Sequence, residues 1–280
     1  MPFFSVIIPT YNRALFLNIA IRSVLEQTFS NYELIIVDDG STDNTKDIVE
    51  KYKLENPSKL IKYIYQKNSG PAKSRNTGIK NATGLYICFL DSDDRFRQNK
   101  LEITYNYIKK YPKYKIFHTE EIWYKNSRLL PQKKHHKKPN GWIFKNAVKI
   151  CSISISTVAI HKDIFSDIGL FDENLLACED YDFWLRVTSK YPVKLIPHYL
   201  TIKEGGHSDQ QSFKFEAMDR FRIYALKKIL ENNSLTKENY NYALEALIEK
   251  CNIVINGALK RKKYSEAQEY STLINKFKNV

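Results

Sequence analysis

The segment "LYICFLDSDDRF", residues 85–96, is the strongest indicator of the fold, because an apolar run ends in three acids within four positions. Such a run is typical of a buried strand, and charges directly after it need donors, a cation or solvent. Residues two apart in an extended segment point the same way, so Asp91 and Asp93 share one face while Asp94 points elsewhere. Paired carboxylates suit Mg²⁺ or Mn²⁺, which proteins hold with one or two carboxylates plus substrate phosphates. A solvated acidic turn is the alternative for this motif alone.

The chain upstream repeats this alternation of strand and helix signals. Apolar runs typical of buried strands lie at residues 3–8, 32–37, 60–65 and 85–90, and helical spacing of apolar residues follows at 17–25, 48–52 and 72–82. Such alternation predicts an α/β fold, with a mostly parallel sheet covered by helices on both faces. Ligands of such sheets bind beyond the carboxyl ends of the strands.

Polar segments follow three of these strands, and the topology brings them to one edge. They are "PTYNR" at 9–13, "DDGSTDNT" at 38–45 and "DSDD" at 91–94. Ser41 to Asp43 are typical helix-capping residues, and Gly40 suits a left-handed turn. Asp38 and Asp39 are not explained by capping, because two adjacent acids after a buried strand need donors or a cation.

Composition narrows the class of protein. The 280 residues are 43% hydrophobic, which is enough to bury a large core, and the net charge is +13. That charge favours phosphorylated ligands, polyanions or an anionic membrane surface, unless it marks only a solvated lysine-rich surface. No apolar run reaches the length of a membrane span and no signal peptide pattern opens the chain, so we expect a cytoplasmic protein, in contact at most with the inner face of the membrane. The four cysteines contain no C-x-x-C pair, which indicates reduced core thiols.

The second half contains a further acidic pair, in "ACEDYDFWLRVTSKY" at 177–191. Tyr181 and Trp184 fall on one helical face, so Glu179 and Asp180 lie in the first turn of the predicted helix. Acids are favoured there by the helix dipole in any case.

A basic run at 129–144, "LLPQKKHHKKPNGWIF", predicts a mobile surface loop, or else a contact with an anionic glycan or lipid headgroups. Repulsion among its lysines argues against a metal on its two histidines. Trp142 after it suits either sugar stacking or core filling. Beyond residue 210, apolar spacing predicts three or four amphipathic helices that pack on the catalytic part or form a homo-oligomer.

Taken together, "SVIIPTYNR", "ELIIVDDGSTDNT", "NSGPAKSRNTGI", "GLYICFLDSDD" and "EDYDFWLR" resemble the motifs of family 2 glycosyltransferases, in order and in spacing. The resemblance covers about residues 3–208 and implies the GT-A fold. It implies a nucleoside diphosphate sugar as donor, with Mn²⁺ or Mg²⁺ on the D-x-D motif. We expect a catalytic domain over 1–210, with a nucleotide-binding half at 1–95 and an acceptor half at 96–210, and a helical region over 211–280.

The resemblance also implies residue roles. Asp39 would accept from the ring N–H of the base, Asp91 would contact the ribose or sugar, and Asp93 would ligate the metal. Arg75 would lie beside the nucleotide. This chain departs from the motif at Ser74, where a small apolar residue is usual. The alternative for Arg75 is a side chain that snorkels from its helix to solvent. The full set of implied nucleotide-binding residues is Pro9, Tyr11, Asn12, Asp38, Asp39, Lys73, Arg75, Asp91 and Ser92.

For the chemistry, the resemblance assigns the general base to the acidic pair of the second half. We expect Asp180 to deprotonate an acceptor hydroxyl as it attacks the anomeric carbon, with Glu179 orienting it, so that one displacement inverts the configuration. His207, beside two glycines in "KEGGHSDQQSF", suits a further metal ligand, a turn histidine or a phosphate donor.

The expected activity is transfer from a uridine-linked sugar to a hydroxyl of a glycan or lipid-linked acceptor. A nucleotidyltransferase is the first alternative, but the glycine-rich phosphate loop of many such enzymes is missing. A non-catalytic glycan or nucleic-acid binding module is the second. Paired acids beside the pocket would repel a polyanion, so no nucleic acid partner is expected.

Overall fold

The computed structural model describes residues 1–132, 136–206, 217–232 and 234–278. In this part of the chain, nine strands form one sheet in the order β3-β2-β1-β4-β8-β6-β9-β5, with β7 paired to β6 outside that path. The strands are β1 Phe4–Thr10, β2 Tyr32–Asp38, β3 Leu60–Tyr65, β4 Tyr86–Phe89, β5 Asp94–Phe96, β6 Ile116–Lys125, β7 Arg128–Leu130, β8 Val158–His161 and β9 Lys194–Gly205. The helices are α1 Ala14–Leu25, α2 Thr45–Glu55, α3 Pro71–Asn81, α4 Lys100–Lys110, α5 Phe144–Ala147, α6 Asp163–Ile168, α7 Glu179–Lys190, α9 Asp219–Glu231, α10 Lys237–Lys260 and α11 Tyr264–Lys278, with the 3₁₀ turn η2 Ile155–Thr157.

The predicted parallel sheet is present in the N-terminal half. Strands β3, β2, β1 and β4 are all parallel, and their bounds lie close to the predicted runs. Beyond β4 the sheet is mixed, because β8 runs antiparallel to β4 and β6, whereas β6 and β9 are parallel. Strand–helix alternation predicts parallel pairing only where each crossover is a helix, and that pattern stops after β4.

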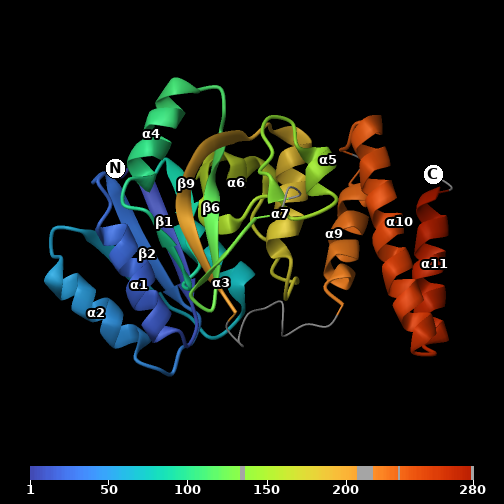
Figure 1. Cartoon of the computed structure of the whole chain (residues 1–280), viewed down its shortest axis with the longest axis horizontal. Helices are drawn as coiled ribbons and strands as arrows, with labels where there is room; N and C mark the ends of the chain where they lie inside the picture. Colours follow the sequence, from blue (N-terminus) through green and yellow to red (C-terminus); the bar gives the residue numbers. More distant parts are fainter. Residues whose placement is uncertain (133–135, 207–216, 233, 279–280) are drawn as a thin grey trace.

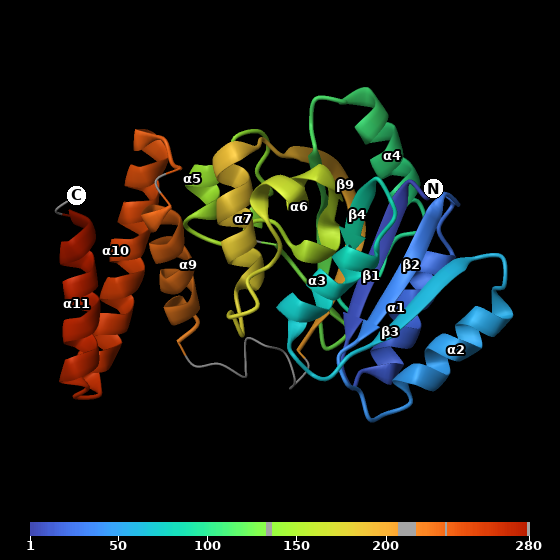
Figure 2. The same cartoon turned by 180° about the vertical axis from the view of Figure 1, so that it is seen from behind.

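Helices cover both faces of the sheet, as Figures 1 and 2 show from opposite sides. The alternation of side chains along β1 assigns the faces. Val6 and Ile8 pack in one buried cluster with residues of α1, α2 and α4. Ile7, between them, packs in a second cluster with residues of α3, α6 and α7. Strands β1, β2 and β4 are therefore buried on both sides, which explains their apolar runs, whereas β3 lies at the edge of the sheet and is partly exposed.

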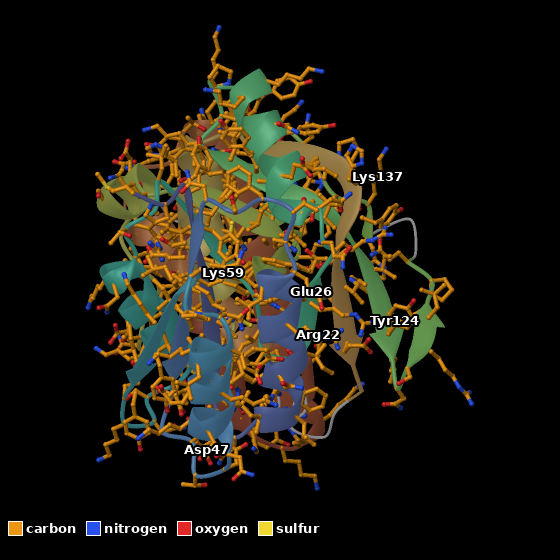
Figure 3. All side chains as sticks on the ribbon, turned by 90° about the vertical axis from the view of Figure 1, so that its left-hand side faces the viewer. Arg22, Glu26, Asp47, Lys59, Tyr124 and Lys137 are labelled. Atoms are coloured by element: carbon orange, nitrogen blue, oxygen red, sulfur yellow. The ribbon has the colours of Figure 1, made fainter. Side chains whose placement is uncertain are left out.

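The outward face of α1 is mixed, because Leu15 and Ile19 are exposed on it as well as Arg22. Arg22 and Glu26 lie one turn apart on it and form an ion pair with 2.6 Å between Nε and Oε1 (Figure 3). Such exposed pairs contribute little to stability. This side of the molecule is thus an ordinary solvated surface.

Helices α9, α10 and α11 form a bundle at the end of the molecule opposite α2 (Figure 1). They pack against α7 in a third buried cluster, where Tyr181 and Leu185 of α7 meet Leu226 of α9 and Leu247 of α10. The predicted amphipathic helices therefore pack on the rest of the same chain. Within the described ranges, no helix has both the length and the apolar character needed to cross a bilayer.

Candidate active site

The carboxyl ends of β1, β2 and β4 meet at one edge, because Thr10 pairs with Asp38 and Ile7 with Phe89 in parallel register. A cavity of about 720 Å³ lies beyond this edge. Its wall contains these residues predicted from the motifs: Pro9, Tyr11, Asp39, Arg75, Asp91, Ser92 and Asp93. It also contains residues that were not predicted, among them Arg13, Asn68, Ser69, Gly70, Asp94, Glu173, Lys203 and Glu204.

Asp39 is held at the cavity wall by the start of α3. Its Oδ1 accepts from Gln66 Nε2 at 2.7 Å and from the Ser69 amide at 3.0 Å, and its Oδ2 accepts from the Gly70 amide at 2.8 Å. The chain therefore supplies the donors that two adjacent acids were predicted to need. One lone pair of Oδ2 has no donor among these contacts, which leaves it available to a ligand N–H.

The turn after β2 is built around Asp38 and Gly40. Asp38 accepts from the Ser41 amide at 2.8 Å and from the Tyr63 hydroxyl at 2.6 Å. Gly40 has φ +87°, and a Cβ there would lie 2.9 Å from the Asn68 amide nitrogen, so the predicted left-handed turn requires glycine. Asp38 thus shapes the turn that presents Asp39.

Three of the predicted nucleotide-binding residues, including Asp38, are absent from the wall of the large cavity. Asn12 accepts from the Thr42 amide through Oδ1 at 2.7 Å, which ties the loop after β1 to the loop after β2. Lys73 is paired with Glu173, with 3.0 Å between Nζ and Oε2. The structure therefore gives Asn12, Asp38 and Lys73 contacts within the protein, and binding of a nucleotide by them stays a prediction.

Arg75 lies between two acids from distant parts of the chain. It is 6% exposed, so it does not snorkel to solvent. Its Nη2 pairs with Asp91 Oδ1 at 2.9 Å and its Nη1 pairs with Glu179 Oε1. Burial acts to lower the pKa of Arg75, but the Glu179 and Asp91 carboxylates outweigh it and raise the pKa. The sequence placed Arg75 beside the nucleotide, but it predicted neither the contact with Asp91 nor the one with Glu179, which lies 104 residues away.

The acidic triplet surrounds the floor of the large cavity. Asp93 Oδ2 pairs with Arg13 Nη1 at 2.9 Å, and Asp94 on β5 faces Lys203 on β9, with 3.5 Å between Oδ2 and Nζ. Burial and the neighbouring Asp91 carboxylate raise the pKa of Asp93, and burial raises the pKa of Asp94 to about 8. The cluster therefore contains more negative charge than its cations neutralise.

These acids fit a divalent cation on two observations. First, the Asp93 carboxylate already binds one cation, the guanidinium of Arg13. Second, the carboxylates of Asp91 and Asp93 repel each other, and a further cation between them would reduce that repulsion. Across the described ranges, no group of three or more His, Cys, Asp or Glu side chains is arranged to hold a metal. The described residues therefore supply one or two carboxylates to a bound ion, and substrate phosphates and water are the usual further ligands of such ions. His207, the other predicted ligand, lies outside the described residues.

A second cavity of about 290 Å³ shares Arg75, Asp91 and Lys203 with the first. Its other lining residues are Cys151, Ser154, Ile155, Cys178, Glu179, Asp180, Tyr181, Met218 and Arg222. The predicted acidic pair therefore opens α7 and faces this cavity. Asp180 accepts from Cys151, with 3.2 Å between Oδ2 and Sγ, while burial and the Asp180 charge raise the pKa of that thiol.

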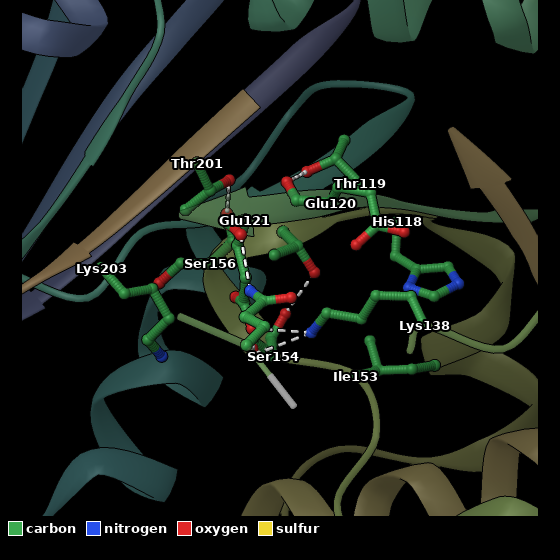
Figure 4. Close-up of polar contacts among 12 residues, drawn as sticks. His118, Thr119, Glu120, Glu121, Lys138, Ile153, Ser154, Ser156, Thr201 and Lys203 are labelled. Carbon is green, nitrogen blue, oxygen red and sulfur yellow. Dashed lines mark hydrogen bonds and ion pairs between the residues drawn. The ribbon is translucent and has the colours of Figure 1, made fainter. Parts of the chain in front are cut away.

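A buried ion pair fixes the wall of the second cavity (Figure 4). Lys138 Nζ lies 2.7 Å from Glu121 Oε1, and both side chains bond to the Ser154 hydroxyl, at 3.2 and 2.8 Å. Two residues on, the Ser156 hydroxyl accepts from the Asp91 amide at 3.0 Å. The expectation of a surface loop is wrong for Lys138, whose side chain is 5% exposed, because Glu121 on β6 compensates its buried charge.

Trp142 is 70% exposed, so the core-filling alternative for it is wrong. Several of the unpredicted site residues lie inside motifs that the sequence analysis quoted, namely Arg13, Asn68, Ser69, Gly70 and Asp94. Lys203 opens the quoted segment "KEGGHSDQQSF" but was not singled out there. Arg222 had no signal in the sequence, because it reaches its cavity from a helix that no motif marks.

Comparison with solved structures identifies the fold. The chain resembles residues 1–349 of S. aureus TarS in complex with UDP-GlcNAc, with a TM-score of 0.73 and 24% identity over 90% of this chain and 72% of that one. It also resembles the mannosyltransferase PcManGT of Pyrobaculum calidifontis in complex with GDP-Man and Mn²⁺, with a TM-score of 0.68 and 15% identity over 99% and 84% of the two chains. The fold is the GT-A fold of nucleotide-sugar glycosyltransferases.

The family follows from sequence comparison. A model of Glycosyl transferase family 2 matches residues 5–165, and the chain belongs to this family. An uncharacterized glycosyltransferase of Rickettsia conorii is 40% identical over 186 residues, which are 66% of this chain and 30% of that protein. TuaG of Bacillus subtilis, named for teichuronic acid biosynthesis, is 32% identical over 190 residues, 68% and 73% of the two chains. The chain thus spans about 30% of the length of the first of these relatives.

Proposed function

We propose that this protein is an inverting glycosyltransferase that moves a sugar from a nucleoside diphosphate sugar, a uridine one, to a hydroxyl of a glycan or lipid-linked acceptor. The observation that carries the proposal is the position of Arg75. One guanidinium pairs with Asp91 in the donor cavity and with Glu179 beside Asp180 in the second cavity. The two cavities therefore adjoin at Arg75, which with Asp91 and Lys203 lines both of them, as transfer between two bound substrates requires.

The large cavity suits the donor. Its walls offer Asp39 with an unused lone pair and the exposed ring of Tyr11. Asp93, with Asp91 beside it, would hold Mn²⁺ or Mg²⁺, which when bound would neutralise the diphosphate as it leaves. The predicted division into a donor half at 1–95 and an acceptor half at 96–210 is in keeping with most of this wall, although Glu173, Leu175, Leu176, Lys203 and Glu204 come from the second half.

Asp180 suits the general base of the second cavity. In the described part of the chain Asp180 forms no ion pair, whereas its neighbour Glu179 is bound by Arg75. An unpaired carboxylate can take a proton from an acceptor hydroxyl, while a carboxylate held by a guanidinium orients the start of α7. Proton removal on one side and departure of the diphosphate on the other constitute a single inverting displacement.

A donor screen tests the proposal. The protein is incubated with uridine, guanosine and other nucleoside diphosphate sugars, with Mn²⁺, Mg²⁺ or EDTA, and release of the nucleoside diphosphate by slow hydrolysis is measured. We expect metal-dependent release from one uridine-linked donor, and a metal-dependent rise in Tm with UDP.

Other results would point elsewhere. Transfer of the nucleotidyl group with release of pyrophosphate would identify a nucleotidyltransferase. Stabilisation by oligonucleotides or glycans without metal, together with the absence of hydrolysis for every donor, would identify a binding module. Either result would overturn the proposal.

A further inference from the structure

The second cavity is closed on one side by a helix that lies outside the matched family region. Helix α9 contributes Met218, just before its first residue, and Arg222, one turn into it. It stands beside α7, the helix that carries Asp180, in both Figure 1 and Figure 2. The family match ends at residue 165, so this wall is a feature of the C-terminal helices.

Arg222 is only partly neutralised by the protein. Its Nη1 pairs with Asp219 Oδ1 at 2.9 Å, but the same oxygen also lies 3.7 Å from Nζ of Lys250. Two cations therefore share one carboxylate, which leaves about one positive charge at this wall. The Nε of Arg222 is buried and has no hydrogen-bond partner within the described ranges.

The other cations of this cavity are already engaged. Arg75 is bound by two carboxylates, and Lys203 faces Asp94. The cavity therefore has an unpaired carboxylate, Asp180, in one wall and an incompletely neutralised guanidinium, Arg222, in another. Guanidinium groups suit phosphate and carboxylate because their planar fork donates two parallel hydrogen bonds.

Resting on the proposed function, we propose that Arg222 binds an anionic group, a phosphate or a carboxylate, on the acceptor and thereby selects negatively charged acceptors. A volume of about 290 Å³ accommodates one sugar or polyol unit with its charged substituent. With the anion on Arg222, a hydroxyl of the same unit is directed towards Asp180. The proposal makes Arg222 a specificity-determining residue of the acceptor cavity.

The test measures the binding of matched ligand pairs by ligand-observed NMR, in the absence of donor. The pairs are glycerol 3-phosphate with glycerol, and methyl glucuronide with methyl glucoside. In the wild-type protein we expect the charged member of at least one pair to bind more tightly. In Arg222→Gln its Kd rises about 10-fold to 100-fold, the usual loss for a hydrogen bond to a charged group, and the pair affected tells phosphate from carboxylate.

Arg220→Gln is the matched control, because Arg220 lies on the same helix but pairs with Glu266, and it does not line the cavity. This variant keeps the wild-type preference, and the thermal unfolding of both variants checks that the bundle is intact. Equal binding of charged and neutral members by the wild type, or an unchanged preference in Arg222→Gln, overturns the inference. Donor hydrolysis by the wild type tests the proposed function separately, because it requires no acceptor and no anion.

Discussion

The two cavities lie side by side but differ in how the chain builds them. Most of the wall of the donor cavity comes from residues 9–94, where three parallel strands end at one edge. The wall of the second cavity comes from segments spread between Arg75 and Arg222. In the first cavity local motifs carry the chemistry, whereas in the second the tertiary structure brings it together. Hence specificity for the acceptor is the property that short motifs predict least.

The largest effect is expected at Asp93 in the donor cavity. Asp93→Asn removes the predicted metal ligand, so metal-dependent release of nucleoside diphosphate falls below detection, and Mn²⁺ binding measured by EPR is lost. The fold persists, because burial and Asp91 already disfavour the charged form of Asp93. Asp47→Asn, on the outer face of α2 (Figure 3), is the control and keeps full activity. Near-normal metal-dependent turnover in Asp93→Asn would remove Asp93 from the metal site.

The second-largest effect is expected at Asp180, and it distinguishes the role of the second cavity from that of the donor cavity. Asp180→Asn removes the proposed base, so turnover with an acceptor falls about 100-fold to 10,000-fold, whereas the Kd for nucleoside diphosphate stays within twofold of the wild type, on the order of 0.4 kcal/mol or less. Asp163→Asn is the control, because Asp163 is also an acid in the first turn of a helix but lies away from both cavities. Weaker nucleotide binding with unchanged turnover would place Asp180 on the donor side.

The third prediction concerns the buried pair behind the second cavity. Lys138→Met leaves Glu121 charged, fully buried and without its cation, so the free energy of unfolding falls by about 3–5 kcal/mol. Lys137→Met changes the neighbouring exposed residue in the same way and has little effect. Chemical denaturation measures both, and Glu121→Gln added to Lys138→Met restores part of the loss. Equal unfolding curves for the two single variants would show that the pair does not stabilise the wall.

The smallest effect is a pH dependence at His118 on β6. Burial and the nearby Lys138 charge lower its pKa to about 3, and its Nε2 lies 2.8 Å from the Pro139 carbonyl oxygen. The unfolded chain therefore binds a proton below about pH 6.5 that the folded chain does not, and stability falls by up to about 1.4 kcal/mol as the pH is lowered from 6.5 to about 5.5. His118→Gln removes this contribution, so its stability curve, measured by denaturation at each pH, is flatter over that range. A slope that is the same in both proteins would contradict the prediction.

The sequence by itself determined the N-terminal half of the fold and which acidic residues lie at the edge of its sheet. Apolar runs between helical repeats predicted β1 to β4 within a few residues, because buried parallel strands cannot alternate with polar residues. The motif after each strand located Asp39, Asp91 and Asp93 at one edge, since parallel strands end on the same side. It also placed Glu179 and Asp180 at the start of a helix, which is α7.

Only the tertiary structure decided which partners these side chains have. Arg75 meets Glu179 across 104 residues, Lys138 is buried against Glu121, and Arg222 reaches the second cavity from a helix that no motif covers. Spacing predicts neighbours only along one helix or strand, because side-chain periodicity is a local property of the backbone. Contacts between elements depend on how apolar faces pack, and many different sequences satisfy the same packing. For that reason the sequence predicted the chemistry of the donor edge, whereas only the tertiary structure showed which charged residues line the second cavity.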